Sequence, residues 1–137
     1  MIDAAGRRSA IVGWLSLAVW MPFGLTLEVL RAWVHPAYLA SPLRRELWTL
    51  AHAHGNWLGI VCLLYAALAE RTIADADTRR SVARSLAIGA VAMPLGFFLG
   101  GLLTSETDPA IGIALAPLGG LFVIHALVLA GWAATRR

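Results

Sequence analysis

The chain has 137 residues, of which 59% are hydrophobic and 14% are charged, and its formal net charge is +3. Soluble domains are usually about 45–50% apolar and about 25% charged, so this composition excludes an ordinary water-soluble domain and a disordered chain. All eleven basic residues are arginine. Basic charge suits nucleic acid or an anionic membrane surface. Because the arginines flank apolar runs, we expect a lipid bilayer and no nucleic-acid partner.

Four apolar runs cover residues 10–33, 47–69, 82–103 and 110–134, and short polar segments join them. Each run is close to the roughly 20 residues that cross a bilayer, and backbone groups in lipid must be paired, so the runs are helices. We therefore predict an all-α fold, a single domain over 1–137 that forms an integral membrane bundle of four antiparallel helices. The first run is too long for the apolar core of a secretion signal and lacks a small-residue cleavage site.

The arginines also predict an orientation, because positive residues are enriched on the cytoplasmic side of a membrane protein. Eight of the eleven lie on the side of the termini: Arg7, Arg8, Arg71, Arg79, Arg80, Arg84, Arg136 and Arg137. The other three are Arg31, Arg44 and Arg45. This asymmetry predicts that both termini are cytoplasmic, in a bacterial-type inner (plasma) membrane.

Small residues at a spacing of four predict close contacts, because in lipid they let backbones approach. Gly55 and Gly59 form one GxxxG pair, Gly96 and Gly100 form another, and Ala116 and Gly120 form a related small pair. The partner is a helix of the same chain, a second copy or a flat cofactor. Tryptophans toward the ends of the runs are typical of interface anchors: these are Trp14, Trp20, Trp33, Trp48 and Trp132.

Few ionisable residues lie within the predicted spans, where such groups are costly and often functional. Glu28 is near the outer end of the first span, His52, His54 and Asn56 are in the outer half of the second, and His125 is in the middle of the fourth. At about 1.5 Å per residue, Glu28, Asn56 and one of the paired histidines share a depth, and His125 is deeper. His52 and His54 are about 200° apart on a helix, so they cannot bind one metal together.

Three interpretations of these polar residues compete. The histidines can be structural, bonded to Glu28 or to backbone carbonyls. Glu28 and one or two histidines can form a metal site. One neutral imidazole can be the axial ligand of haem, which also needs flat apolar walls. The single cysteine, Cys62, excludes an internal disulfide and a zinc cage.

The segment WTLAHAHGNWLG at 48–59 resembles the second helix of the styrene oxide isomerases, a family of small four-helix membrane proteins that bind haem b. Trp48, Ala51-His52 and Gly59 match the family's frame. GFFL at 96–99 resembles its third helix, and ALAP at 114–117 resembles the start of its fourth. The pattern HAHxNxLG also resembles small proteins related to subunit I of haem–copper oxidases.

The resemblance implies haem b, with His52 as the axial ligand of the iron. It also implies a homo-oligomer, preferably a trimer with haem at the subunit contacts, and an iron that acts as a Lewis acid on an epoxide. Two polar positions of the family correspond here to Phe98 and Ala90, which can neither donate a hydrogen bond nor carry charge. Haem binding is therefore a stronger expectation than epoxide isomerisation.

We expect a haem b protein in which His54 is the rival ligand and His125 a candidate second one. Glu28 or Asn56 would orient an imidazole or meet a substrate. Gly55, Gly59, Gly96 and Gly100 would allow close approach of a helix or the porphyrin.

Two haem functions stay open. An enzyme that uses the iron as a Lewis acid or redox centre on a lipophilic small molecule predicts a five-coordinate iron beside a vacant pocket. A non-enzymatic protein for electron transfer, gas sensing or haem handling predicts two axial histidines or a loosely held haem. A haem-free metal or proton site built from Glu28 and the histidines is the third alternative.

Overall fold

The structure is a computed structural model that describes residues 3–102, 104 and 108–136. Its four long helices are α1 (Ala4–Ala32), α3 (Pro42–Thr72), α4 (Ala76–Leu102) and α5 (Leu115–Ala134). A short helix, α2 (Pro36–Leu39), joins α1 to α3, and a 3-10 turn, η1 (Ile111–Ala114), precedes α5. The described ranges contain no strand, which confirms the predicted all-α class.

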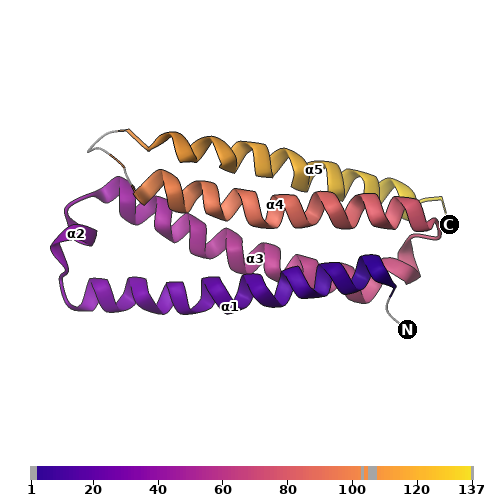
Figure 1. The fold of residues 1–137 in the computed structure, drawn as a ribbon, viewed down its shortest axis with the longest axis horizontal. Coiled ribbons are helices and arrows are strands. Elements are labelled where there is room, and N and C mark those ends of the chain that lie inside the picture. Colours follow the sequence, from indigo (N-terminus) through magenta and orange to yellow (C-terminus); the bar gives the residue numbers. More distant parts are fainter. Residues whose placement is uncertain (1–2, 103, 105–107, 137) are drawn as a thin grey trace.

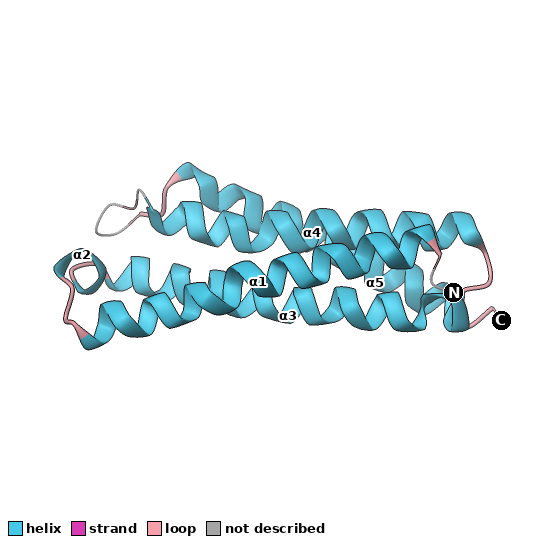
Figure 2. Cartoon of the chain, turned by 60° about the horizontal axis from the view of Figure 1, so that its bottom comes forward, coloured by secondary structure: helices cyan, strands magenta, loops and turns pink. Residues whose placement is uncertain are grey.

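The long helices run alongside one another, and both termini lie at the same end of the molecule (Figure 1). Helix α3 packs against α1 and α4, while α5 packs against α4. Helix α2 lies at the opposite end, which we call the α2 end (Figure 2). The space between α1 and α3 at the α2 end is where the candidate site lies.

Three of the long helices begin before the predicted apolar runs, whereas α5 begins at Leu115 rather than at residue 110, because the 3-10 turn η1 occupies Ile111–Ala114. Helix α1 begins at Ala4 rather than at residue 10, and α3 covers Pro42–Thr72 rather than 47–69. Side-chain caps explain these starts, because Asp3 and Ser41 accept hydrogen bonds from backbone N–H groups of the first turn. A change of hydropathy along the sequence therefore does not mark the end of a helix. The predicted end of the third run, residue 103, lies outside the described residues, as does Arg137.

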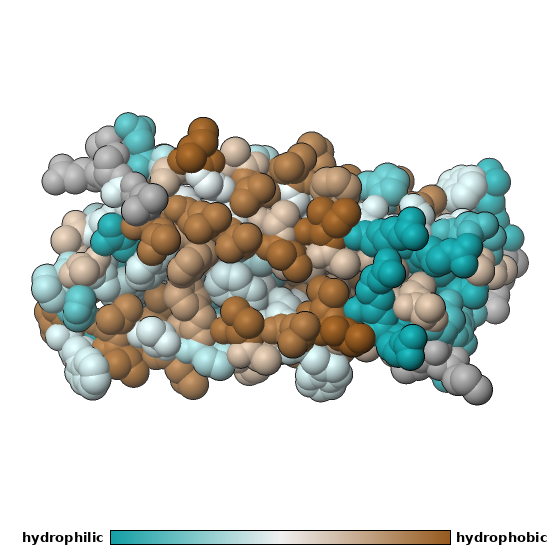
Figure 3. Space-filling model, in the orientation of Figure 1, coloured by the Kyte–Doolittle hydropathy of each residue, from teal (hydrophilic) through white to brown (hydrophobic). Residues whose placement is uncertain are grey.

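Three helical segments are long and apolar enough to cross a membrane: Ala4–Ala32, Ala76–Leu102 and Ile111–Ala134. Large apolar side chains are exposed along them; Leu25 is 70% and Val128 is 67% exposed. Figure 3 shows hydrophobic residues over most of the visible face, with hydrophilic residues gathered at the end that carries the termini. A surface of this kind suits lipid rather than water. The predicted second span lies within α3, which is not one of the three segments.

Glycines bring the helix backbones together. A Cβ atom on Gly59 would lie 3.1 Å from the Gly13 carbonyl oxygen, and one on Gly96 would lie 2.3 Å from the Ala116 backbone nitrogen. Each of the four glycines of the GxxxG pairs faces another segment of this chain. Of the predicted pair of Ala116 and Gly120, only Ala116 makes a close contact within this chain, because nothing lies within 4 Å of a Cβ on Gly120. Its neighbour Gly119 contacts α4 instead.

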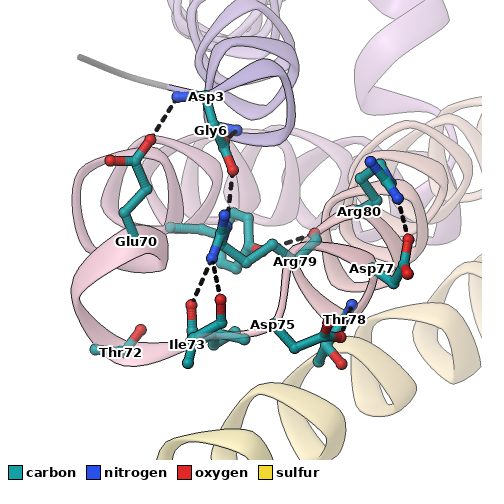
Figure 4. Close-up of polar contacts among 12 residues, drawn as sticks. Asp3, Gly6, Glu70, Thr72, Ile73, Asp75, Asp77, Thr78, Arg79 and Arg80 are labelled. Atoms are coloured by element: carbon teal, nitrogen blue, oxygen red, sulfur yellow. Dashed lines mark hydrogen bonds and ion pairs between the residues drawn. The ribbon is translucent and has the colours of Figure 1, made fainter.

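A network at the end with the termini ties the start of α1 to α3 and α4 (Figure 4). Arg79 Nε donates to Asp3 Oδ2 at 2.7 Å, and the backbone N–H of Asp3 donates to Glu70 Oε1 at 2.6 Å. Arg79 also donates to two backbone carbonyl groups of the link between α3 and α4. The hydrogen bond from the Gly6 N–H, together with Arg79, lowers the pKa of Asp3.

We predict that Asp3→Asn lowers the free energy of unfolding at pH 7 by about 1 kcal/mol, because the pair with Arg79 is partly shielded from solvent. The pKa of Asp3 is lowered in the folded chain, so this contribution is present above the ordinary value of 3.8 and is lost as pH falls through the lower folded value. Denaturant unfolding in detergent micelles at pH 7 and at successively lower pH measures it.

Asp77→Asn is the matched control, since the pair of Asp77 and Arg80 is exposed and contributes little. An equal effect of both substitutions at pH 7, or a loss in Asp3→Asn that does not shrink at low pH, would contradict this account.

Candidate ligand-binding cleft

A cleft of about 630 Å³ lies between α1 and α3, toward the α2 end. Helix α1 contributes apolar side chains, among them Met21 and Leu25, and the cleft also contains Glu28, His52 and Asn56. Pockets for small molecules usually have about 300–1,000 Å³, apolar walls and a few polar groups. The structure thus brings three of the predicted site residues into one cleft of suitable size.

His52 lies across the contact between α3 and α1. Its Nδ1 atom is 2.7 Å from the backbone carbonyl oxygen of Trp20. Since that oxygen can only accept, Nδ1 carries the proton in this contact, and in the neutral ring the lone pair is then on Nε2. Gly24, one turn after Trp20, leaves the space for the ring, because a Cβ atom there would lie 2.1 Å from Cε1 of His52. The contact thus selects, for a neutral imidazole, the tautomer that leaves the lone pair on Nε2.

Asn56 follows His52 by one helical turn. Its Nδ2 donates to the backbone carbonyl of His52 at 3.0 Å, which sets the orientation of the amide. Nδ2 also lies 3.1 Å from Nδ1 of His52, but both atoms are donors here. The Oδ1 atom of Asn56 is buried and has no partner within the described part of the chain. An unpaired buried oxygen costs free energy and needs an explanation, such as a donor brought by a ligand.

His54 and His125 lie at other contacts. His54 Nδ1 is 2.8 Å from the Leu50 carbonyl oxygen, and its ring centroid is 4.9 Å from that of Phe97 on α4. His52 and His54 therefore face α1 and α4 respectively, consistent with their spacing. His125 Nδ1 on α5 lies 3.0 Å from Ser85 Oγ on α4. Among the residues described, no group of three His, Cys, Asp or Glu side chains could hold a metal ion.

A cluster of aromatic rings joins the helices beside the cleft, and the sequence reasoning missed it. Trp48 stacks between Tyr38 and Phe98, with ring centroids 6.2 and 5.9 Å away, and its Nε1 donates to the Phe98 carbonyl at 3.1 Å. Trp20 and Phe23 complete the cluster. Trp20 and Trp48 thus pack on protein rings, in addition to lying toward the ends of the predicted spans. The other three predicted anchors are exposed, as expected: Trp14, Trp33 and Trp132.

A second cleft of about 510 Å³ adjoins the first at the α2 end. Arg31, Tyr38 and Thr49 line both clefts, and Arg45 and Glu46 line only the second. None of these charged groups forms an ion pair with another described residue, since the two recorded pairs lie near the termini. From the sequence, Arg31 and Arg45 contributed only to the predicted orientation in the membrane. Their common position in this cleft could not be predicted from spacing along one helix, because they come from different helices.

No protein-family model, curated protein or solved structure matches this chain. Functional proposals therefore rest on the geometry of the cleft and on the resemblance in the sequence.

We predict that Gly24→Ala lowers the free energy of unfolding by about 1–3 kcal/mol, because its Cβ displaces the His52 ring and breaks the hydrogen bond to Trp20. In a His52→Ala background the same substitution has no ring to displace. It should then raise the free energy of unfolding by about 0.5–1 kcal/mol, since alanine is preferred over glycine within a helix.

Unfolding of the four proteins of this double-mutant cycle in detergent micelles measures the change of sign. Gly120→Ala is the control, because nothing lies within 4 Å of its Cβ. The same sign for Gly24→Ala in both backgrounds would show that His52 does not occupy this position.

Proposed function

We propose that this chain is a haem b-binding integral membrane protein with His52 as the axial ligand. The observation that carries the proposal is the hydrogen bond between His52 Nδ1 and the Trp20 carbonyl oxygen. Metal-ligating histidines usually give their other ring N–H to such a carbonyl, which orients the ring and raises its basicity. The lone pair on Nε2 is the donor that haem iron requires.

The other residues of the cleft fit this group. Met21 and Leu25 supply apolar surface for a macrocycle, and Glu28 and Asn56 supply polar contacts beside it. The four predicted glycines face neighbouring segments of the chain, so their contribution would be indirect. Gly55 and Gly59 draw α1 toward α3 and so hold the walls of the cleft in place, whereas Gly96 and Gly100 pack α4 against α5 and η1 and do not line the cleft.

The proposal includes four membrane spans with both termini in the cytoplasm of a bacterial-type cell. Helix α3 packs between α1 and α4, and its membrane-depth histidines both have partners within the protein. This packing supports α3 as the fourth span beside the three apolar segments. The excess of arginine near the termini supports the orientation. A homo-oligomer, preferably a trimer, is proposed from the resemblance alone.

The presence of one histidine in the cleft favours an iron with an open coordination position over an electron carrier with two axial histidines. His52 is the only imidazole among the described residues that line the cleft, because His54 and His125 lie elsewhere. Bound haem would supply Lewis-acid or redox chemistry for a lipophilic small molecule. Glu28 lines the same cleft and is exposed, so it could accept a proton from that molecule or donate one to it. We therefore propose an enzyme of this type, with a gas-binding or haem-handling protein as the alternative.

Absorption spectra of the detergent-purified protein, oxidised and reduced, test the proposal. We expect a Soret band in the wild type and a high-spin oxidised spectrum, as one axial histidine implies. His52→Ala should lose the band, whereas His54→Ala and His125→Ala, the matched controls, should keep it. A colourless wild type expressed with adequate haem supply, or an unchanged band in His52→Ala, would overturn the proposal.

Two further measurements separate loss of the ligand from loss of the fold. Added imidazole should restore the Soret band of His52→Ala while circular dichroism shows its helix content unchanged. Gly24→Ala keeps the imidazole but displaces it, so it should lower the haem content, whereas Gly120→Ala should not. Equal haem contents in these two glycine variants would count against the assigned position of His52.

A further inference from the structure

We infer that Arg31 and Arg45 form a carboxylate-binding subsite at the α2 end of the cleft, which would hold the two propionate groups of haem b. The inference rests on the proposed function. Arg31 comes from the last turn of α1 and Arg45 from the first turns of α3. Both line the space beyond His52, and Arg31 is common to both clefts.

The two guanidinium groups have donors to spare. The side chain of Arg31 has no hydrogen bond or ion pair with any described residue, and Arg45 uses one N–H group, at 3.3 Å from the Leu39 carbonyl oxygen. Arg44 differs, because it donates to the carbonyl groups of Gly101 and Ala37 and its guanidinium lies over the Trp48 ring. Arg44 therefore joins helices, whereas Arg31 and Arg45 remain available to a ligand.

The positions of the arginines relative to His52 suit a porphyrin. Arg31 lies about two helical turns beyond Gly24, the residue that contacts the His52 ring, and Arg45 lies about two turns before His52. Both therefore lie about 10 Å along the helices from the imidazole, in the same direction. Haem carries its iron at the centre and both carboxylates on one edge. The planar fork of arginine matches a carboxylate with two parallel hydrogen bonds.

Two carboxylates line the same clefts, and their negative charge opposes the binding of an anionic ligand. Glu28 lines the inner cleft with Arg31, and Glu46 lines the outer cleft with Arg31 and Arg45. Neither forms an ion pair with an arginine in the described part of the chain, so each repels an anionic ligand. Removal of the Glu46 charge should therefore strengthen binding of a dicarboxylate, whereas removal of either arginine charge should weaken it. A purely structural role would not produce opposite signs.

The test is titration of the haem-free, detergent-purified protein with haem b and with its dimethyl ester, followed by Soret absorption. The ester keeps the iron and the macrocycle but has no negative charge. We expect the wild type to bind haem b more tightly than the ester. Arg31→Gln and Arg45→Gln should each lower the affinity for haem b about tenfold and leave the affinity for the ester unchanged. Glu46→Gln should raise the affinity for haem b only.

Arg8→Gln changes the net charge equally at the far end of the molecule, and it should leave both affinities as in the wild type. Equal affinities of the wild type for haem b and its ester, or a parallel loss of both in the arginine variants, would overturn the subsite but not haem binding. No Soret change with either compound in the wild type would overturn the proposed function and the subsite with it.

Discussion

A hydrogen bond across the contact between α1 and α3 organises the candidate site. The carbonyl oxygen of Trp20 accepts it from Nδ1 of His52, and the missing side chain of Gly24 makes the approach sterically possible. This contact determines the position of the imidazole and, in the neutral ring, the tautomer that leaves the lone pair on Nε2. Each proposal about the cleft depends on it, because a ring turned toward α4 would leave Glu28 and Asn56 without an imidazole beside them. A backbone carbonyl is also a durable partner, since no side-chain substitution at Trp20 removes it.

A membrane setting, which three apolar helical segments of the described chain support, would explain the distribution of polar groups around this contact. A polar group at membrane depth is costly unless it finds a partner, and three histidines of the long helices have one within the protein. The Oδ1 atom of Asn56 is an exception, buried without a partner beside His52. Within the described part of the chain, Arg31 makes no hydrogen bond or ion pair and Arg45 uses one N–H group, and both lie at the α2 end of the same space. A ligand with carboxylates near the arginines would satisfy them, so a cofactor with an apolar body and an anionic edge is a consistent occupant. Haem has no donor for Asn56 Oδ1, so that donor would come from a second small molecule bound beside it.

The sequence was sufficient to predict the helices but not all of their contacts. Apolar runs predicted four long helices, because length and hydropathy are local properties, and the errors at the ends arose where Asp3 and Ser41 cap helices beyond the apolar runs. The opposite directions of His52 and His54 followed from helical geometry alone. The open surface at Gly120 and the ring contacts of Trp20 and Trp48 were not predicted, because spacing along one helix does not show which face a neighbour covers. For the same reason, the roles of Gly24 and of the arginines of the cleft became apparent only from the packing of α1 against α3.

The most direct test of the central claim is the protonation of His52 in the haem-free protein. Nitrogen-15 NMR of histidine-labelled protein in lipid bilayers, compared with His52→Gln to assign the signals, distinguishes the two ring nitrogens by their chemical shifts. The account predicts that Nδ1 is protonated and hydrogen-bonded, and that Nε2 is unprotonated. A His52 with the proton on Nε2, or one that exchanges between both tautomers, would contradict it, because the Trp20 carbonyl would then not hold the ring and no lone pair would be presented to the cleft.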